Sequence, residues 1–258
     1  MTMRGVLRVH DRTYTASFDD DPSMSVCKVR FPWPVEPPTN VFGDGLAGVT
    51  VLSVHCIDSC ATIAPEYGNN TAYVRTGAVL KPFVLPTAAV HTLEQLTAYL
   101  TANKLPLTLD SAARVLSFTQ ANSTLLLPIQ DNIWGLKEMF GFTSPLPVEY
   151  VNGVACVAIA TNSKASRPPN PRGPMQTLTV DCDEAVNTRI PGCQSTCLFT
   201  PDTPNNSAYS VHYPVPFQVP LNCSKQVTTL TFTIRDAMQR NCIFLTGVPT
   251  ITFQLRFL

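Results

Sequence analysis

The sequence Val227-Thr-Thr-Leu-Thr-Phe-Thr-Ile234 alternates apolar and polar side chains, and Thr250-Ile-Thr-Phe-Gln-Leu-Arg-Phe257 repeats the pattern. A period of two over eight residues places alternate side chains on opposite faces of a β-strand. β-Branched and aromatic residues dominate both runs, as a pleated and half-buried surface favours. We therefore predict that the chain ends in two strands, each with one buried face.

The buried faces of these two strands define a candidate core. A third run, at 177–182, places its apolar residues on one face in the same way. We predict that the residues on these three faces pack together inside a sheet structure: Leu178, Val180, Leu230, Phe232, Ile234, Ile251, Phe253, Leu255 and Phe257.

The rest of the chain contains many short apolar runs separated by Pro, Gly and Asn. We predict strands at 25–31, 49–57, 71–85, 151–160, 195–199 and 207–218. Together with the runs above, these make about eight strands outside a central insert, the number that a jelly roll needs. The fold class predicted from the sequence is therefore all-β, a single jelly-roll sandwich. The proline-rich stretch at 32–38 cannot be a central strand, because Pro donates no ladder hydrogen bond, and we interpret it as an extended connector.

Helical patterns interrupt the strands at about 90–142. Thr92-Leu-Glu-Gln95 is a capping-box sequence, and leucines follow it at helical spacing. Alternation at 105–109 and at 116–118 predicts a hairpin, and a second short helix follows Asp131 and ends at Gly141. We predict a small helix–hairpin–helix insert, an α+β subdomain, within one jelly-roll domain.

The predicted domain organisation has two further boundaries. The jelly roll covers 25–258, with the insert inside it. Residues 1–24 mix arginines with three consecutive aspartates and are interpreted as an N-terminal arm. Its basic residues are the candidate contacts to an adjacent subunit: Arg4, Arg8 and Arg12. The alternative for this arm is a solvated or interior-facing tail.

The composition restricts the class of partner. Charged residues make up 14% of the chain, and 18 basic residues balance 18 acidic ones, so an electrostatic grip on nucleic acid is not expected. A surface so poor in charge is better suited to contacts with other proteins, although an ordinary low-charge β protein is the simpler interpretation. No apolar run is long enough to span a membrane, and the first ten residues contain no signal-peptide core. We expect most of the nine cysteines to be buried and reduced.

The sequence contains only weak matches to cofactor-binding, metal-binding and catalytic motifs. The glycines of 43–48 match a dinucleotide-binding pattern, but an apolar β run follows them instead of a helix. Cys56 and Cys60 beside His55 have a permissible zinc spacing, as do Cys193 and Cys197, for which a disulfide is also open. The four histidines lie near no nucleophile motif. We expect no catalytic activity, no cofactor and no metal, although a spatially assembled triad would not be visible in sequence order.

Five consecutive signatures in the C-terminal half resemble one family. They are Thr177–Cys182, Cys197–Pro201, Tyr213–Phe217, Leu230–Ala237 and Gly247–Phe257. Together with the helical module that precedes them, they resemble the minor capsid (penton) proteins of Polinton-type and adintovirus-like double-stranded DNA viruses. The resemblance covers about residues 90–258. It implies a single jelly roll in a pentamer at the fivefold vertices of an icosahedral capsid, with neighbouring major and minor capsid proteins as partners and the virion as the location.

The leading interpretation is therefore a structural capsid protein, the vertex penton. A small major capsid protein or a cement protein of the same kind of virion is the alternative within this class. An alternative of another class is a β-sandwich attachment or carbohydrate-binding module, which would need exposed aromatic rings at loop tips, with Trp33 and Trp134 as the tryptophan candidates. A hydrolase is a more distant alternative.

Overall fold

The chain divides into two compact units. The first unit combines Met1–Asp58 with Thr177–Leu258, and the second is Ser59–Gln176. The computed structural model describes residues 12–35, 47–57, 59–129, 134–184, 195–199, 208–212, 218–220 and 227–257. Among these, the side chains of 13–31, 48–57, 59–129, 134–184 and 228–255 are described.

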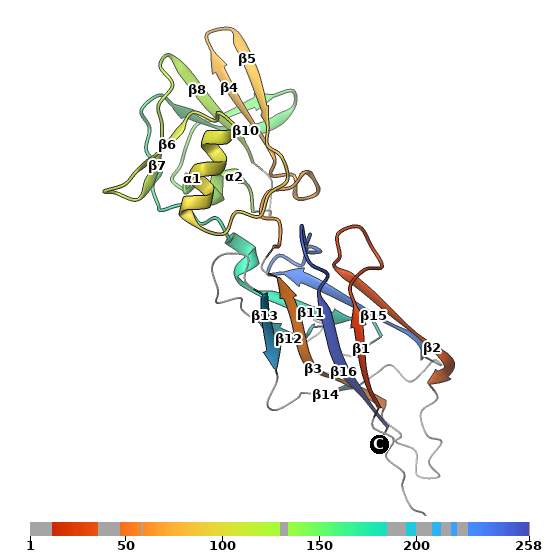
Figure 1. Cartoon of the computed structure of the whole chain (residues 1–258). Helices are drawn as coiled ribbons and strands as arrows, with labels where there is room; N and C mark the ends of the chain where they lie inside the picture. The colour runs from red at the N-terminus through yellow and green to blue at the C-terminus, as the bar shows by residue number, and fades with distance from the viewer. Residues whose placement is uncertain are drawn as a thin grey trace, which may run out of the picture. The chain divides into compact units, whose positions relative to one another are not determined.

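The first unit consists of β-strands, which Figure 1 labels. They are β1 (Arg12–Ser17), β2 (Val26–Val35), β3 (Ala47–Ile57), β11 (Leu178–Cys182), β12 (Ser195–Phe199), β13 (Ala208–His212), β14 (Gln218–Pro220), β15 (Val227–Asp236) and β16 (Thr250–Phe257). β13 and β14 both pair with β3, at successive positions along it, so together they act as one interrupted strand.

These strands form two antiparallel sheets. One has the order β1-β16-β3-β13, with β14 also on β3, and the other has the order β12-β11-β15-β2. Counting β13 and β14 as one, the sheets read 1-8-3-6 and 5-4-7-2, which is the strand order of an eight-stranded jelly roll. The prediction of an all-β jelly roll is confirmed.

The core of the jelly roll lies between the two sheets. The rings of Phe232 in β15 and Phe253 in β16 come from different sheets, and their centroids are 4.8 Å apart. Tyr14 of β1 stacks on Phe253 at 5.4 Å. Eight of the predicted core residues are buried: Leu178, Val180, Leu230, Phe232, Ile234, Ile251, Phe253 and Leu255. The side chain of the ninth, Phe257, is outside the described residues.

The second unit contains a five-stranded sheet, a separate hairpin and two short helices. The sheet is formed by β4 (Thr71–Thr76), β5 (Val79–Val84), β8 (Ser123–Pro128), β9 (Val148–Val151) and β10 (Val154–Ala160), in the order β5-β4-β8-β10-β9. The hairpin is β6 (Leu107–Asp110) with β7 (Val115–Phe118). The helices are α1 (Leu93–Ala102) and α2 (Leu136–Phe140), with single 3-10 turns at Pro65–Tyr67 and Gly173–Gln176.

The second unit has its own hydrophobic core. Twenty buried residues form one cluster between the sheet, the helices and the hairpin, among them Leu96, Leu100, Phe118 and Phe140. The predicted capping box at the start of α1 is present, because Thr92 accepts from the backbone of Gln95 while the Gln95 side chain accepts from the backbone of Thr92. A core of this size lets the unit bury its apolar surface without help from the jelly roll.

The unit is larger than the predicted insert at 90–142. The predicted helices and hairpin are there, but residues of β4, β8 and β10 belong to their core and Phe83 of β5 packs against it, so the compact unit extends over Ser59–Gln176. α2 begins after Gly135 and ends at Gly141, whose backbone φ of 83° suits glycine. The predicted cap, Asp131, lies outside the described residues.

The N-terminal arm predicted at 1–24 is partly strand. Arg12–Ser17 forms β1, and it pairs with β16 in register from Arg12↔Leu255 to Ser17↔Thr250. From Thr13 to Ser17 the residues alternate, but the apolar positions are only Tyr14 and Ala16, and so short and weakly apolar a pattern was not recognised as a strand. Residues 1–11 remain as the candidate arm and lie outside the described residues.

Two further expectations are corrected. The predicted strand at 151–160 begins three residues too early, because β10 starts at Val154 and a turn at Asn152 and Gly153 separates it from β9. The proline-rich stretch at 32–38 is not a connector throughout, because β2 continues to Val35. β2 is at the edge of its sheet, where a proline disrupts no internal ladder bond, so the exclusion from a central strand holds.

Candidate interaction surfaces

The residues considered for chemistry are only partly described, and those that are described form no metal-binding group. His91 is buried, and its Nε2 lies 2.7 Å from the carbonyl oxygen of Cys60. Cys56 and Cys60 are buried thiols. His10, the side chain of His212, Cys193 and the side chain of Cys197 lie outside the described residues. Within the described ranges, no group of three or more His, Cys, Asp and Glu side chains could hold a metal ion. No described helix is long and apolar enough to cross a membrane.

Burial controls the ionisation of three thiols. Burial, followed by the charges of Asp20 and Asp19, raises the pKa of Cys27 from 9.0 to about 12. Burial is also the main cause that raises the pKa of Cys182, and it raises that of Cys156 together with the nearby Glu149 charge. Since the thiolate is the reactive form, these three cysteines are poor nucleophiles and poor metal ligands in the folded protein.

We expect Cys27, Cys156 and Cys182 to be alkylated at pH 8 more slowly in the folded than in the urea-unfolded chain, by about a hundredfold or more for Cys27. Above pH 9 the unfolded chain loses the Cys27 proton while the folded chain keeps it up to about pH 12. The free energy of unfolding should therefore fall across this window as the pH rises. Peptide mass mapping after timed alkylation reports each cysteine separately, and rapid native labelling of these three would contradict the burial described here.

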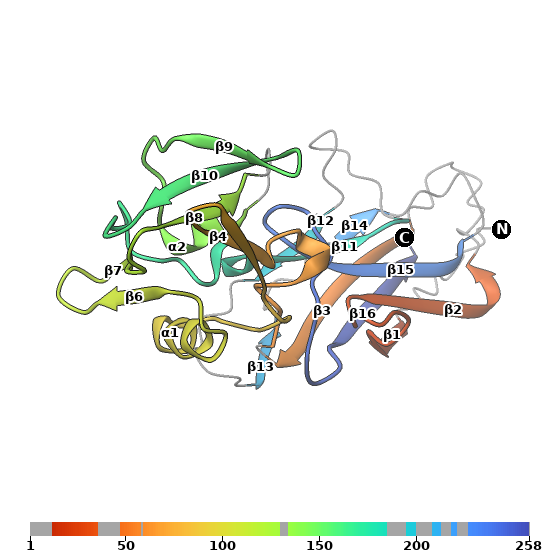
Figure 2. The same cartoon turned by 90° about the horizontal axis from the view of Figure 1, so that it is seen from above.

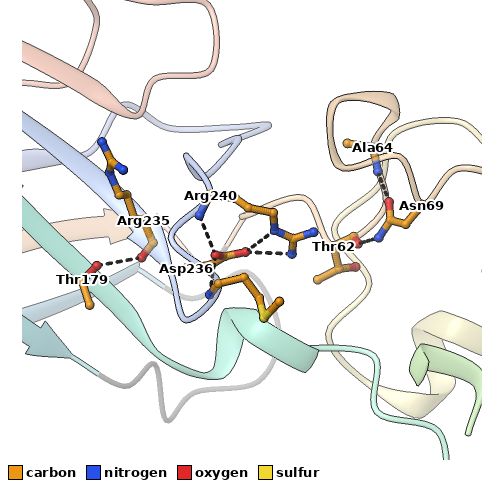
Figure 3. A network of polar contacts seen from close by, with 8 residues as sticks. Thr62, Ala64, Asn69, Thr179, Arg235, Asp236 and Arg240 are labelled. Carbon is orange, nitrogen blue, oxygen red and sulfur yellow. Dashed lines mark hydrogen bonds and ion pairs between the residues drawn. The ribbon is translucent and has the colours of Figure 1, made fainter. Parts of the chain in front are cut away.

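A buried ion pair fixes the loop between β15 and β16 (Figure 3). The carboxylate of Asp236, which is fully buried, accepts from the backbone N–H groups of Met238 at 2.8 Å and Arg240 at 2.9 Å. Its other oxygen accepts from Arg240 Nε at 2.8 Å and Nη2 at 2.7 Å. The loop that follows presents exposed apolar side chains at Met238, Leu245 and Val248. The ion pair thus holds the start of an apolar loop in one conformation.

A second polar clamp closes a loop at the start of the second unit. Asn69 is buried, its Oδ1 accepts from Ala64 N at 3.0 Å, and its Nδ2 donates to Thr62 O at 2.7 Å (Figure 3). With both ends of its amide engaged, this side chain closes the loop and is not available as a surface contact.

Exposed apolar side chains concentrate on the two outer strands of the five-stranded sheet. β5 carries Val79, Leu80 and Val84, and the β9–β10 hairpin carries Val148, Tyr150 and Val154. These are six of the nine large exposed hydrophobic residues among the described side chains, and the other three are in the β15–β16 loop. Figure 2 shows the β9–β10 hairpin. Apolar groups gathered at sheet edges mark surfaces suited to protein contacts.

An ion pair lies across one face of the same sheet. Arg75 of β4 donates to both carboxylate oxygens of Glu149 in β9, with 2.9 Å between Nη2 and Oε1. This side-chain hydrogen bond lowers the pKa of Glu149. The pair spans two intervening strands and lies on the face where Leu126, Cys156 and Ala158 form a small apolar cluster. Glu149 therefore adds little unpaired charge to the β9 edge.

The tryptophan proposed for sugar stacking at 134 is not arranged for that role. Trp134 is half-buried and packs against the core of the second unit. Its indole lies so close to Gly173 that a side chain there would overlap it. A ring held in this way does not offer a free face to a sugar. The side chain of Trp33 is outside the described residues.

Sequence reasoning missed the edge strands as functional candidates, although a turn signal was available for each. Asn152 and Gly153, with φ of 50° and 82°, form a two-residue turn of the kind that Asn-Gly favours. Gly77, with φ of 56°, occupies the first position of the two-residue turn between β4 and β5. The sequence already shows an interruption of the run at 71–85 by Gly77, and recognising the Asn152-Gly153 turn would likewise have separated β9 from β10.

The predicted inter-subunit contacts can be placed only in part. Arg12 is the first residue of β1, where its backbone pairs with Leu255, and its side chain is not described. Arg4 and Arg8 lie outside the described residues. The basic arm is therefore limited to the residues that precede β1.

Comparisons with known proteins gave similar structures but no family. No protein-family model and no curated protein matches the chain. The mavirus penton protein is similar over 97% of this chain and 100% of its own, at 7% sequence identity and a TM-score of 0.44. A chain in the structure of the Sputnik virophage is similar over 95% of this chain and 97% of its own, at 9% identity and a TM-score of 0.39.

Proposed function

We propose that this protein is a structural capsid subunit, the penton that occupies the fivefold vertices of an icosahedral virion. The observation that carries the proposal is the complete eight-stranded jelly roll with a compact unit inserted between its third and fourth strands, β3 and β11. Because a fold alone does not fix a function, the C-terminal signatures from Thr177 to Phe257 supply the second support, through their resemblance to penton proteins of Polinton-type and adintovirus-like viruses.

Assembly, not chemistry, would then be the work of the protein. Five copies would close a ring through heterologous head-to-tail contacts, as cyclic symmetry requires. Each contact would bury on the order of 800 Å² per partner, the scale of a stable specific interface. The neighbouring major and minor capsid proteins would bind the outer surfaces of the ring. The low content of charge, 14%, suits a chain with several protein neighbours.

The alternatives are less well supported. A small major or cement capsid protein would share the fold, and only the penton resemblance favours the vertex over it. A carbohydrate-binding module is disfavoured by the packing of Trp134 against the core of the second unit.

Light scattering and negatively stained images of the purified full chain test the proposal. We expect particles of five times 28.2 kDa with fivefold symmetry. Removing residues 1–11 should weaken association while the jelly roll stays folded, because β1 begins only at Arg12. A truncation to residue 24 is not equivalent, since it would delete an edge strand of the sheet. A chain that stays monomeric at high concentration and enters no capsid-like particle would contradict the penton role.

A further inference from the structure

We propose that copies of this protein join head to tail through the two outer strands of the inserted sheet, with β5 of one copy beside β9 of the next. The proposal rests on the ring assembly proposed above and assigns one of its contacts. The β5 edge is Val79–Val84, and the β9 edge is Val148–Val151. They are the two ends of one sheet, in the order β5-β4-β8-β10-β9.

Both edges carry large exposed apolar side chains, and the β5 edge also carries the exposed Lys81 and Pro82. On the β5 edge Val79 is 68% exposed and Val84 70%, and on the β9 edge Val148 is 53% exposed and Tyr150 76%. Exposed apolar edges are sites of pairing with other chains, and soluble proteins usually blunt them with short strands, charges or prolines. Glu149, the one charged residue of the β9 edge, is instead tied to Arg75 of its own sheet. A partner that covers this edge therefore meets no unpaired carboxylate there.

The backbone of the β9 edge has hydrogen-bonding groups that point away from β10. Ala158 N donates to Pro147 O at 2.8 Å, so Pro147 and Ala158 are a hydrogen-bonded pair. In an antiparallel ladder such pairs alternate with pairs whose groups point outward. By the observed register, the outward positions are Val148 and Tyr150. In this strand, the residues with the most exposed side chains are therefore also the residues whose backbone N–H and C=O groups point away from β10.

The same reasoning places the outward groups of the β5 edge. Leu85 N donates to Asn70 O at 2.7 Å, and the register with β4 then makes Leu80, Pro82 and Val84 the outward positions. Pro82 loses no bond within the sheet, because its nitrogen would face outward in any case. Because proline has no backbone N–H group, Pro82 removes one hydrogen-bond donor from the middle of the free edge. The β5 edge can therefore accept at three positions and donate at two.

The β5 edge lacks a donor at Pro82, whereas the β9 edge lacks none at Val148 and Tyr150, and this difference favours contact between unlike edges. Two β5 edges paired with each other would each lose a donor at Pro82, and would leave the apolar β9 edges in water. A β5 edge beside a β9 edge covers both apolar strands of every copy, and the single proline still accepts through its carbonyl. In a closed ring, every edge of this sheet would then be paired, which is how closed sheets avoid exposed strands. The area is below a full interface, so other surfaces of the ring add to it.

Cross-linking of paired cysteine variants tests this contact. Val79→Cys and Tyr150→Cys, whose side chains lie on the same face of the sheet by the observed registers, are combined in one chain. The assembled protein is treated with a bis-maleimide that spans adjacent strands, about 5 Å apart. We expect a ladder of covalent oligomers up to the pentamer. Neither single variant should give it, because in a head-to-tail contact residue 79 never meets residue 79. The unsubstituted chain is the background control, since its described cysteines are buried.

The outcomes separate this contact from the assembly itself. Rings without a ladder in the double variant would overturn the edge contact and leave the penton proposal standing. Dimers from Val79→Cys or Tyr150→Cys alone would show that like edges meet, and would also overturn it. Absence of rings would overturn both.

A charge substitution gives an independent readout. Tyr150→Lys should raise the dissociation constant of the ring about tenfold or more, because it places a charge in the buried contact. Thr108→Lys, on an exposed strand position of the separate β6–β7 hairpin, is the matched control and should leave assembly unchanged. Equal assembly of the two variants would contradict the proposal.

Discussion

Replacing Phe253 with alanine is expected to lower the free energy of unfolding by about 3–5 kcal/mol, the range for emptying a phenylalanine site in a core. Phe253 is fully buried, and its ring contacts Phe232 of the opposite sheet and Tyr14 of the neighbouring strand. The cavity would therefore open between the two sheets, where neither sheet can collapse into it without disturbing the other. Urea unfolding followed by circular dichroism measures the change.

Thr252→Ala is the matched control, because Thr252 is adjacent in β16 but on the opposite face. Its hydroxyl lies 3.2 Å from that of Thr15 in an exposed contact. Its loss should cost far less than the loss of Phe253. Equal unfolding midpoints for the two variants would show that the two faces of β16 are assigned wrongly.

The strands that sequence reasoning located best are those with one buried face. In β15 and β16, the residues Leu230, Phe232, Ile251 and Phe253 are buried, and Thr231 and Thr252 between them are partly covered, whereas Thr233 is buried as well. One-sided burial imposes a period of two on the sequence, and such a period can be detected without a structure. The capping box of α1 was predictable for a similar reason, because its interactions are local in sequence.

The alternation of apolar and polar residues is lost where a β-bulge shifts the register of a strand, and where both faces of a strand are buried. In β3, the buried side chains Val49 and Val51 are followed by Val54 and Cys56, because the register against β16 shifts between Thr252 and Phe253. This β-bulge leaves an extra residue in β3 and reverses its alternation. Such a shift depends on the partner strand, which lies far away in the sequence.

β10 illustrates the second case. Cys156 and Ala158 lie in the small cluster on one face, while Val157 and Ile159 lie in the main core on the other. A strand buried on both faces is a continuous apolar run, so its limits and its hairpin turn are not set by hydrophobicity. The candidate contact surface was unpredictable for a related reason. Whether a strand is at an edge depends on the order of pairing in the sheet. Pro82 restricts β5 to an edge position, but no local pattern in β9 encodes that order.

The second large effect is expected at the ion pair of the β15–β16 loop. Asp236→Asn should lower the free energy of unfolding by about 3–5 kcal/mol, the range for removing one partner of a buried pair. The carboxylate offers both of its oxygens to four donors, two of them in the Arg240 side chain. An asparagine keeps one acceptor oxygen and replaces the other with a donor, which would face a donor already in place. The charge of Arg240, whose side chain is 18% exposed, would also lose the carboxylate opposite it.

Asp110→Asn is the control for this substitution, because it makes the same chemical change in an exposed pair. Asp110 accepts from Lys164 at 2.8 Å, and the Lys164 side chain is 61% exposed, so water can replace the interaction at little cost. Urea unfolding of the two variants, measured in parallel, separates the effect of burial from that of charge. A large loss for Asp236→Asn with almost none for Asp110→Asn would establish that the buried carboxylate holds the loop. If both variants unfold at the midpoint of the original chain, the loop must be held by the packing of Cys242 and Phe244, which are buried in the same segment.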